Sequence, residues 1–111
     1  MGLGFSVDDL DFFIISEISQ GNDSTWEIAK KYFELENGNK YEITSKNMLV
    51  KKRIQKMSEW GLFNISKEEK GWKNEYQLIK EHFKIGKHKF PDGYFDSIYL
   101  KINDSWVVFQ K

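Results

Sequence analysis

The sequence contains no cysteine, a single proline and no long apolar run. The absence of cysteine excludes disulfides, thiolate catalysis and cysteine-ligated zinc sites together. No apolar stretch approaches the roughly 18 residues that a membrane span requires, and no signal peptide precedes the first expected helix. We therefore expect a cytoplasmic protein without membrane contact, and the length of 111 residues predicts a single domain over 1–111.

Recognisable catalytic and metal-binding patterns are missing as well. The two histidines, His82 and His88, have no cysteine partner and few neighbouring carboxylates, whereas a metal site needs three or four convergent ligands. The sequence shows no Ser/His/Asp arrangement, no glycine-rich phosphate loop and no inward pair of carboxylates. We therefore predict that the protein is not an enzyme and that it has neither a metal site nor a cofactor.

Charge is balanced overall but unevenly distributed along the chain. A net charge of zero argues against a general polyanion binder. Residues 1–44 nevertheless hold nine acidic and three basic residues, whereas residues 45–89 hold twelve basic and five acidic residues. The net charges of these segments are −6 and +7, and residues 90–111 carry −1. A chain with this distribution can present one basic face to phosphate groups.

The central stretch 44–65, TSKNMLVKKRIQKMSEWGLFNI, predicts a helix followed directly by a strand. Thr44 or Ser45 is suited to cap the start of this helix. An apolar stripe recurs at helical spacing within about 40° on a helical wheel, and consists of Val50, Ile54 and Met57. Met48, Lys52, Gln55 and Glu59 fall on the opposite side. Gly61 is suited to end the helix because glycine accepts the left-handed conformation of a C-terminal cap.

Two amphipathic helices are expected before this stretch. Residues 6–9 have the pattern of a capping box, and the helix that follows is predicted to end near Gln20. Phe12 and Ile15 lie off its apolar stripe and indicate a second contact. The next helix is expected to begin after Asp23, Ser24 or Thr25 and to run to about Leu35, and residues 36–41 are expected to form a loop.

The remainder of the chain is predicted to be β-structure. Extended runs at 62–65 and 76–79 flank the polar segment 66–75, which is the pattern of a hairpin with a long tip. Residues 83–110 predict a three-stranded antiparallel meander, with turns at 91–93 and 103–105.

The order of these elements resembles the winged-helix (winged helix-turn-helix) DNA-binding transcription regulators of archaea and bacteria. The matching residues are Val50, Lys52, Arg53, Ile54, Met57, Gly61, Leu62 and Phe63, together with Ile28 and Ala29 in the second helix. The resemblance implies an α+β fold of three helices and a β-hairpin wing, with an appended C-terminal antiparallel β-meander. Residues 1–82 would form the core helices and the wing, and residues 83–111 the C-terminal extension. The loop 36–41 is longer than the turn of a simple helix-turn-helix.

The function that the resemblance implies is sequence-specific binding of double-stranded DNA by a small transcriptional regulator, acting as a homodimer. Helix 45–60 would enter the major groove and the wing 66–75 would lie on the backbone or in the minor groove. The expected nucleic-acid-binding residues are Ser45, Lys46, Asn47, Lys51, Lys52, Gln55 and Lys56 from the helix, and Lys70, Trp72 and Lys73 from the wing. Arg53 borders the apolar stripe and is as well placed to brace Glu59 or the wing as to touch DNA.

Two alternatives remain open at this point. Winged helices also serve as protein-interaction modules without DNA binding, and the acidic first 44 residues favour such an adaptor. The aromatic residues of the C-terminal third are expected in the core or at a dimer contact, but they could instead line a ligand pocket. A small-molecule effector therefore stays open, although no residue specifically supports one.

Overall fold

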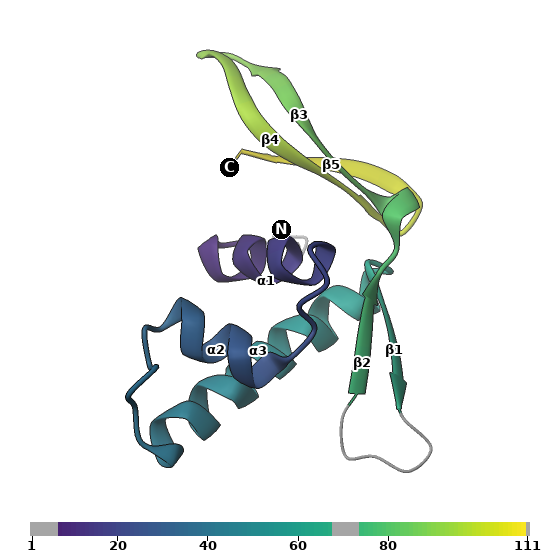
Figure 1. Ribbon diagram of the computed structural model, residues 1–111. Helices are drawn as coiled ribbons and strands as arrows, with labels where there is room; N and C mark the ends of the chain where they lie inside the picture. The colour runs from purple at the N-terminus through teal and green to yellow at the C-terminus, as the bar shows by residue number, and fades with distance from the viewer. Residues whose placement is uncertain (1–6, 68–73, 111) are drawn as a thin grey trace, which may run out of the picture. The chain divides into compact units, whose positions relative to one another are not determined.

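The computed structural model describes residues 7–67 and 74–110 of the chain (Figure 1). It contains three helices, a two-stranded antiparallel sheet and a three-stranded antiparallel sheet, so the fold class is α+β as predicted. The chain divides into two compact units, Met1–Arg53 and Ile54–Lys111, and each is described by itself. In the described ranges no helix has both the length and the apolar character that crossing a bilayer requires.

Helix α1 (Asp9–Ser19) begins with a reciprocal capping box made by two aspartates. The Asp8 carboxylate accepts a hydrogen bond from the N–H of Asp11 at 3.1 Å, and the Asp11 carboxylate accepts one from the N–H of Asp8 at 3.2 Å. This box usually carries Glu or Gln at its third helical position, and here the shorter Asp fills the role. The apolar stripe Leu10, Ile14 and Ile18 is buried, and the off-stripe Ile15 is fully buried too.

Helix α2 (Thr25–Tyr32) is shorter than predicted, since it ends at Tyr32 and not near Leu35. Of the three candidate caps, Ser24 is the one that the structure uses, and its hydroxyl accepts a hydrogen bond from the N–H of Glu27 at 3.2 Å. The helix stops because Glu34 takes a left-handed conformation with φ of 55°, after which the N–H of Leu35 donates to the carbonyl of Lys30.

Helix α3 (Lys40–Glu59) begins five residues earlier than the predicted start at residue 45. Asn39, and not Thr44 or Ser45, caps it, because the Asn39 side-chain oxygen accepts a hydrogen bond from the N–H of Glu42 at 2.9 Å. Much of the expected loop 36–41 is therefore helical or capping. Ile43, which precedes the predicted start at residue 45, is a buried residue of the first turn of α3.

The predicted core side and end of this helix are confirmed. Val50, Ile54 and Met57 are all completely buried, as their spacing indicated. Gly61 follows with a φ of 93°, a left-handed conformation that residues with a Cβ rarely adopt. The N–H of Leu62 then donates to the carbonyl of Met57 at 3.1 Å, which closes the C-terminal turn and leads the chain into a strand.

The second unit carries both sheets. Strands β1 (Phe63–Lys67) and β2 (Asn74–Leu78) pair in antiparallel fashion, with Phe63 opposite Leu78 and Lys67 opposite Asn74. Each strand therefore extends two residues into the segment 66–75 that we expected to be the hairpin tip. Lys70, Trp72 and Lys73 lie outside the described residues, so their predicted role stays a prediction.

The C-terminal meander is confirmed. After the short 3-10 turn η1 (Lys80–His82), strands β3 (Phe83–Phe90), β4 (Gly93–Ile102) and β5 (Ser105–Gln110) form an antiparallel sheet in the order β3-β4-β5 (Figure 1). The β4–β5 connection is a two-residue turn in which Asn103 and Asp104 both have positive φ, the conformation that suits the twist of a hairpin. Ile98, Leu100 and Ile102 of β4 are buried.

Candidate nucleic-acid interface

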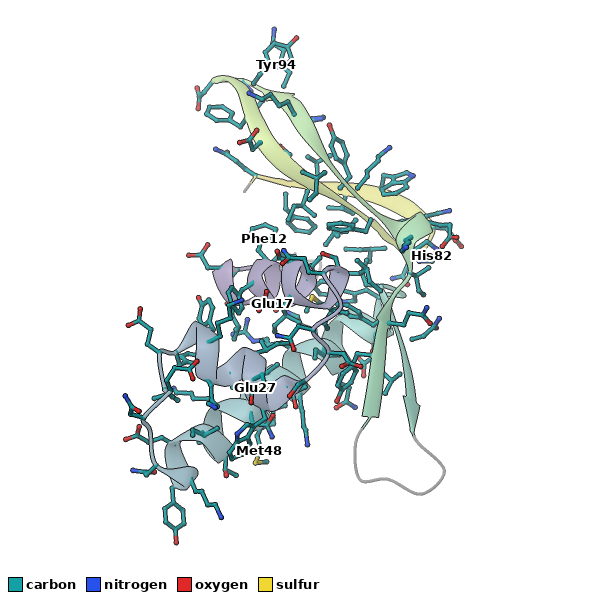
Figure 2. All side chains as sticks on the ribbon, in the orientation of Figure 1. Phe12, Glu17, Glu27, Met48, His82 and Tyr94 are labelled. Carbon is teal, nitrogen blue, oxygen red and sulfur yellow. The ribbon has the colours of Figure 1, made fainter. Side chains whose placement is uncertain are left out.

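The exposed side of α3 is the candidate interface. On a helical wheel Tyr41, Ser45, Met48 and Lys52 fall within about 60° of one another, and we call these four residues the outer face of α3. All four are exposed, with Tyr41 at 88% and Met48 at 54%. Figure 2 labels Met48 on this side of the helix. Lys51 lies beside this face and is also exposed. Among the DNA-contacting residues predicted from the helix, the exposed ones are therefore Ser45, Lys51, Lys52 and Gln55.

Lys46 and Asn47 do not belong to the outer face. Because α3 begins at Lys40, they lie in its second turn and not in its first, and both are half-buried. The Lys46 ammonium lies 4.7 Å from the centre of the Phe33 ring, which holds it beside the chain that leaves α2. The Asn47 side-chain oxygen is buried without a hydrogen-bond partner among the described residues. Their role in DNA contact was predicted from a position in the first turn of the helix, whereas the structure places both in the second turn and half-buried.

Lys56 is held near the end of α3. Its ammonium lies 5.0 Å from the centre of the Trp60 ring, and the side chain is half-buried. Trp60 itself is buried, with 8% of its surface exposed. A lysine over an indole keeps its charge while its position becomes more defined, so Lys56 contributes positive charge with less freedom than Lys51 or Lys52.

Arg53 has partners that the sequence analysis did not foresee. Its guanidinium Nη1 lies 2.7 Å from Asp8 Oδ2 and 3.4 Å from Asp11 Oδ2, so it binds both carboxylates of the α1 capping box. The hydrogen bond from Arg53 lowers the pKa of the Asp8 carboxyl, and the same bond raises the pKa of Arg53. Arg53 is thus neutralised within its unit, and the exposed cationic groups beside it are Lys51 and Lys52.

A second charged pair fixes α2 to α1. The Lys31 ammonium donates to Glu17 Oε1 at 2.8 Å, and the amide of Asn22 donates to the same oxygen at 3.2 Å. The Glu17 side chain is only 7% exposed, whereas that of Lys31 is 60% exposed. The hydrogen bond from Lys31 lowers the pKa of the Glu17 carboxyl. The pair holds the helix pair α1–α2 together and does not add to the basic surface.

We expect this pair to make stability depend on pH in the acidic range. A lowered carboxyl pKa in the folded state stabilises the fold above the unfolded value of 4.5, and that contribution is lost as the pH falls through the lowered folded pKa. Lys31→Met should therefore cost about 1–2 kcal/mol near pH 7, and the cost should shrink below about pH 4. Urea unfolding of both proteins between pH 7 and pH 3 measures this difference.

Lys30→Met is the matched control for that experiment. Lys30 pairs only loosely, at 3.7 and 3.8 Å, with the exposed carboxylates of Glu27 and Glu36. Its replacement should cost less than about 0.5 kcal/mol at any pH. A cost of Lys31→Met that stays constant from pH 7 to pH 3 would show that the Glu17 carboxylate is not its origin.

Comparisons of the chain with protein-family models, with curated proteins and with solved structures give no match.

Over residues 7–67 and 74–110, no group of three or more histidine and carboxylate side chains is placed to hold a metal ion. His82 instead lies 2.7 Å from the carbonyl of Gly61, and His88 lies 3.2 Å from the Tyr99 hydroxyl.

Proposed function

We propose that the protein binds double-stranded DNA through the outer face of α3 and acts as a small transcriptional regulator of the winged-helix kind. The observation that carries this proposal is the pair Lys51 and Lys52, which is exposed on a helix whose core side, Val50, Ile54 and Met57, is fully buried. A helix seated in this way presents cations at fixed positions. The order of three helices followed by the β1–β2 hairpin is compatible with the winged-helix class.

The chemistry of the face suits a major groove. The groove is about 12 Å wide and accepts an α-helix with its side chains. Lysine can meet guanine or phosphate, glutamine can bind adenine through two hydrogen bonds, and serine can bind either a phosphate or a base edge. Ser45 and Lys52 of the outer face, with the exposed Gln55 beside them, supply one of each kind. Binding as a homodimer, with two copies of α3 about one helical turn of DNA apart, would follow the usual geometry of such regulators.

One observation favours the second candidate, a protein-interaction module. The outer face carries two large exposed apolar side chains, Tyr41 at 88% and Met48 at 54%. They lie seven residues apart, which places them on the same side of the helix. Exposed apolar groups of this kind often mark a protein contact. In the DNA proposal they would instead lie against thymine methyl groups or sugars, so Tyr41→Ser with Met48→Ser should weaken DNA binding only modestly.

Salt dependence of duplex binding tests the proposal. We expect mixed-sequence duplex DNA to bind, and log K to fall linearly with log salt with a slope of about −0.9 for each phosphate contacted. Fluorescence anisotropy with a labelled duplex at several salt concentrations measures this slope. If no duplex binds at low salt, while the Tyr41 and Met48 substitutions abolish capture of a protein partner, the adaptor function is the correct one.

A further inference from the structure

A second surface with nucleic-acid chemistry lies on the three-stranded sheet. Residues directly opposite each other in an antiparallel pair point to the same side. Lys84 is opposite Tyr99, His88 is opposite Phe95, and Lys101 is opposite Trp106. Alternation along each strand places these residues and Phe90 on one side of the sheet. We call this side the aromatic face, and its rings and central cation are Lys84, His88, Phe90, Phe95, Tyr99 and Trp106.

The rings of this face and the Lys84 ammonium form a row. The Lys84 ammonium lies 4.5 Å from the centre of the Trp106 ring and 5.3 Å from that of Tyr99. His88 follows, with ring centres 5.7 Å from Tyr99 and 5.0 Å from Phe90, and Phe90 lies 6.1 Å from Phe95. The Tyr99 hydroxyl donates to the carbonyl of Lys87 at 3.2 Å, which fixes the ring in the middle of the row.

The aromatic face is accessible and carries only positive charge. Trp106 is 43% exposed, and Lys84 is exposed beside it. Asp96 is the one acidic residue in the three strands, and it lies on the opposite side, where its carboxylate is 3.9 Å from the Lys87 ammonium. Lys84 and Lys101 therefore have no competing carboxylate on their own side of β3, β4 and β5, all of which are described. Flat rings with cations and without anions are complementary to bases and phosphates.

We propose that the aromatic face binds single-stranded nucleic acid, with bases stacked on Trp106 and Tyr99 and with Lys84 and Lys101 on the phosphates. Base stacking on aromatic side chains tolerates any sequence because every base has a π-face. Lys84 now covers the two rings in a contact that is weak at an exposed site. A base can displace the ammonium from the rings, and the freed ammonium can then pair with the neighbouring phosphate.

This activity goes beyond the proposed duplex binding and is independent of it. In a duplex the bases are paired and stacked on each other, so a sheet that stacks bases selects the single strand. The outer face of α3 and the aromatic face belong to different units of the chain. Loss of one activity by substitution should therefore leave the other unchanged, and either proposal can fail alone.

Fluorescence anisotropy with labelled oligonucleotides of about 12 nucleotides, oligo-dT and oligo-rU, tests this proposal. We expect Trp106→Ala to weaken binding about tenfold or more, and Trp106→Phe to keep most of it because a smaller ring still stacks. The ratio of the two affinities assigns the ligand to DNA or RNA. Far-ultraviolet circular dichroism and the melting temperature of each variant verify that the sheet is intact.

Two lysines on one strand provide the matched control. Lys84→Glu and Lys87→Glu make the same charge change on β3, but only Lys84 lies on the aromatic face. We expect Lys84→Glu to weaken single-strand binding about tenfold and Lys87→Glu to weaken it no more than about twofold. The double change Lys51→Glu and Lys52→Glu should leave single-strand binding in place.

Three results would overturn the proposal. Equal losses from Lys84→Glu and Lys87→Glu would show that binding follows total charge and not the aromatic face. Unchanged binding by Trp106→Ala would exclude stacking on this ring. A dimer that sediments as a monomer after Trp106→Ala would show that the aromatic face is a contact between two copies of the chain.

Discussion

The double substitution Lys51→Glu and Lys52→Glu is expected to weaken duplex DNA binding about hundredfold or more near 0.1 M salt. Both lysines are exposed on α3, and among the described residues neither forms an ion pair that would already use its charge. The double change removes two cations and places two anions beside phosphates. The salt slope should therefore become shallower by about two, which anisotropy titrations at several salt concentrations will measure.

A control with the same charge change separates this effect from net charge. Lys80 and Lys87 are exposed and lie outside α3 in the sequence, and their joint replacement by glutamate also changes the charge by four. That variant should lose much less affinity and keep the salt slope. The melting temperature of both double variants should stay near that of the wild type, because exposed substitutions usually change stability by less than about 0.5 kcal/mol. Equal losses of duplex affinity in the two variants would show that α3 is not the element that contacts DNA.

Arg53→Met should destabilise the protein by about 3 kcal/mol, the largest effect on stability that we expect from a single charged residue. The guanidinium contacts both carboxylates of the α1 capping box, and the Asp11 side chain is only 1% exposed. Without Arg53 the buried Asp11 carboxylate loses one charged partner, and removing a charged partner from a buried carboxylate costs more than the pair contributes when intact. Urea unfolding at pH 7, followed by circular dichroism, gives the change in the free energy of unfolding.

Two neighbouring substitutions make the result specific. Arg53→Lys should cost clearly less, because one ammonium can still approach both carboxylates, although it lacks the planar fork of arginine. Lys52→Met removes a cation of similar length one position earlier on the exposed side, and should cost less than about 0.5 kcal/mol. If Arg53→Met and Lys52→Met proved equally mild, the capping box would not depend on Arg53.

The sequence was most informative about features that depend on residues within a single helix or turn. The spacing of Val50, Ile54 and Met57 predicts the buried side of α3 because helical periodicity is local. Turn residues likewise predict the strands of the meander. The predicted start of α3 at residue 45 was wrong. Asn39 is as suitable a cap as Thr44 or Ser45, and local residue preference does not choose among the three.

Contacts between elements could not be predicted in the same way. Arg53 binds Asp8 and Asp11, and both lie more than forty residues away from it in sequence. The half-buried Lys46 lies over the ring of Phe33, the C-terminal cap of a different helix, α2. For the candidate interface, the exposed positions Lys51 and Lys52 follow from the wheel alone, whereas the contacts of Lys46 and Arg53 required the packed structure.

The aromatic face shows the same limit. Its central residues Lys84, Tyr99 and Trp106 come from three different strands. They share a side only because the register pairs Lys84 with Tyr99 and Lys101 with Trp106. A shift of one residue in either pair would send the corresponding side chains to the other side. The sequence showed abundant aromatic residues there, but not which of them lie together.

The central claim is that the outer face of α3 contacts duplex DNA, and amide chemical-shift mapping by NMR during titration with a short duplex tests it most directly. We predict that the largest shifts occur at Ser45, Met48, Lys51 and Lys52, and that they disappear as salt is raised. Saturable shifts that leave these four residues unchanged, or no shifts at low salt, would contradict the claim.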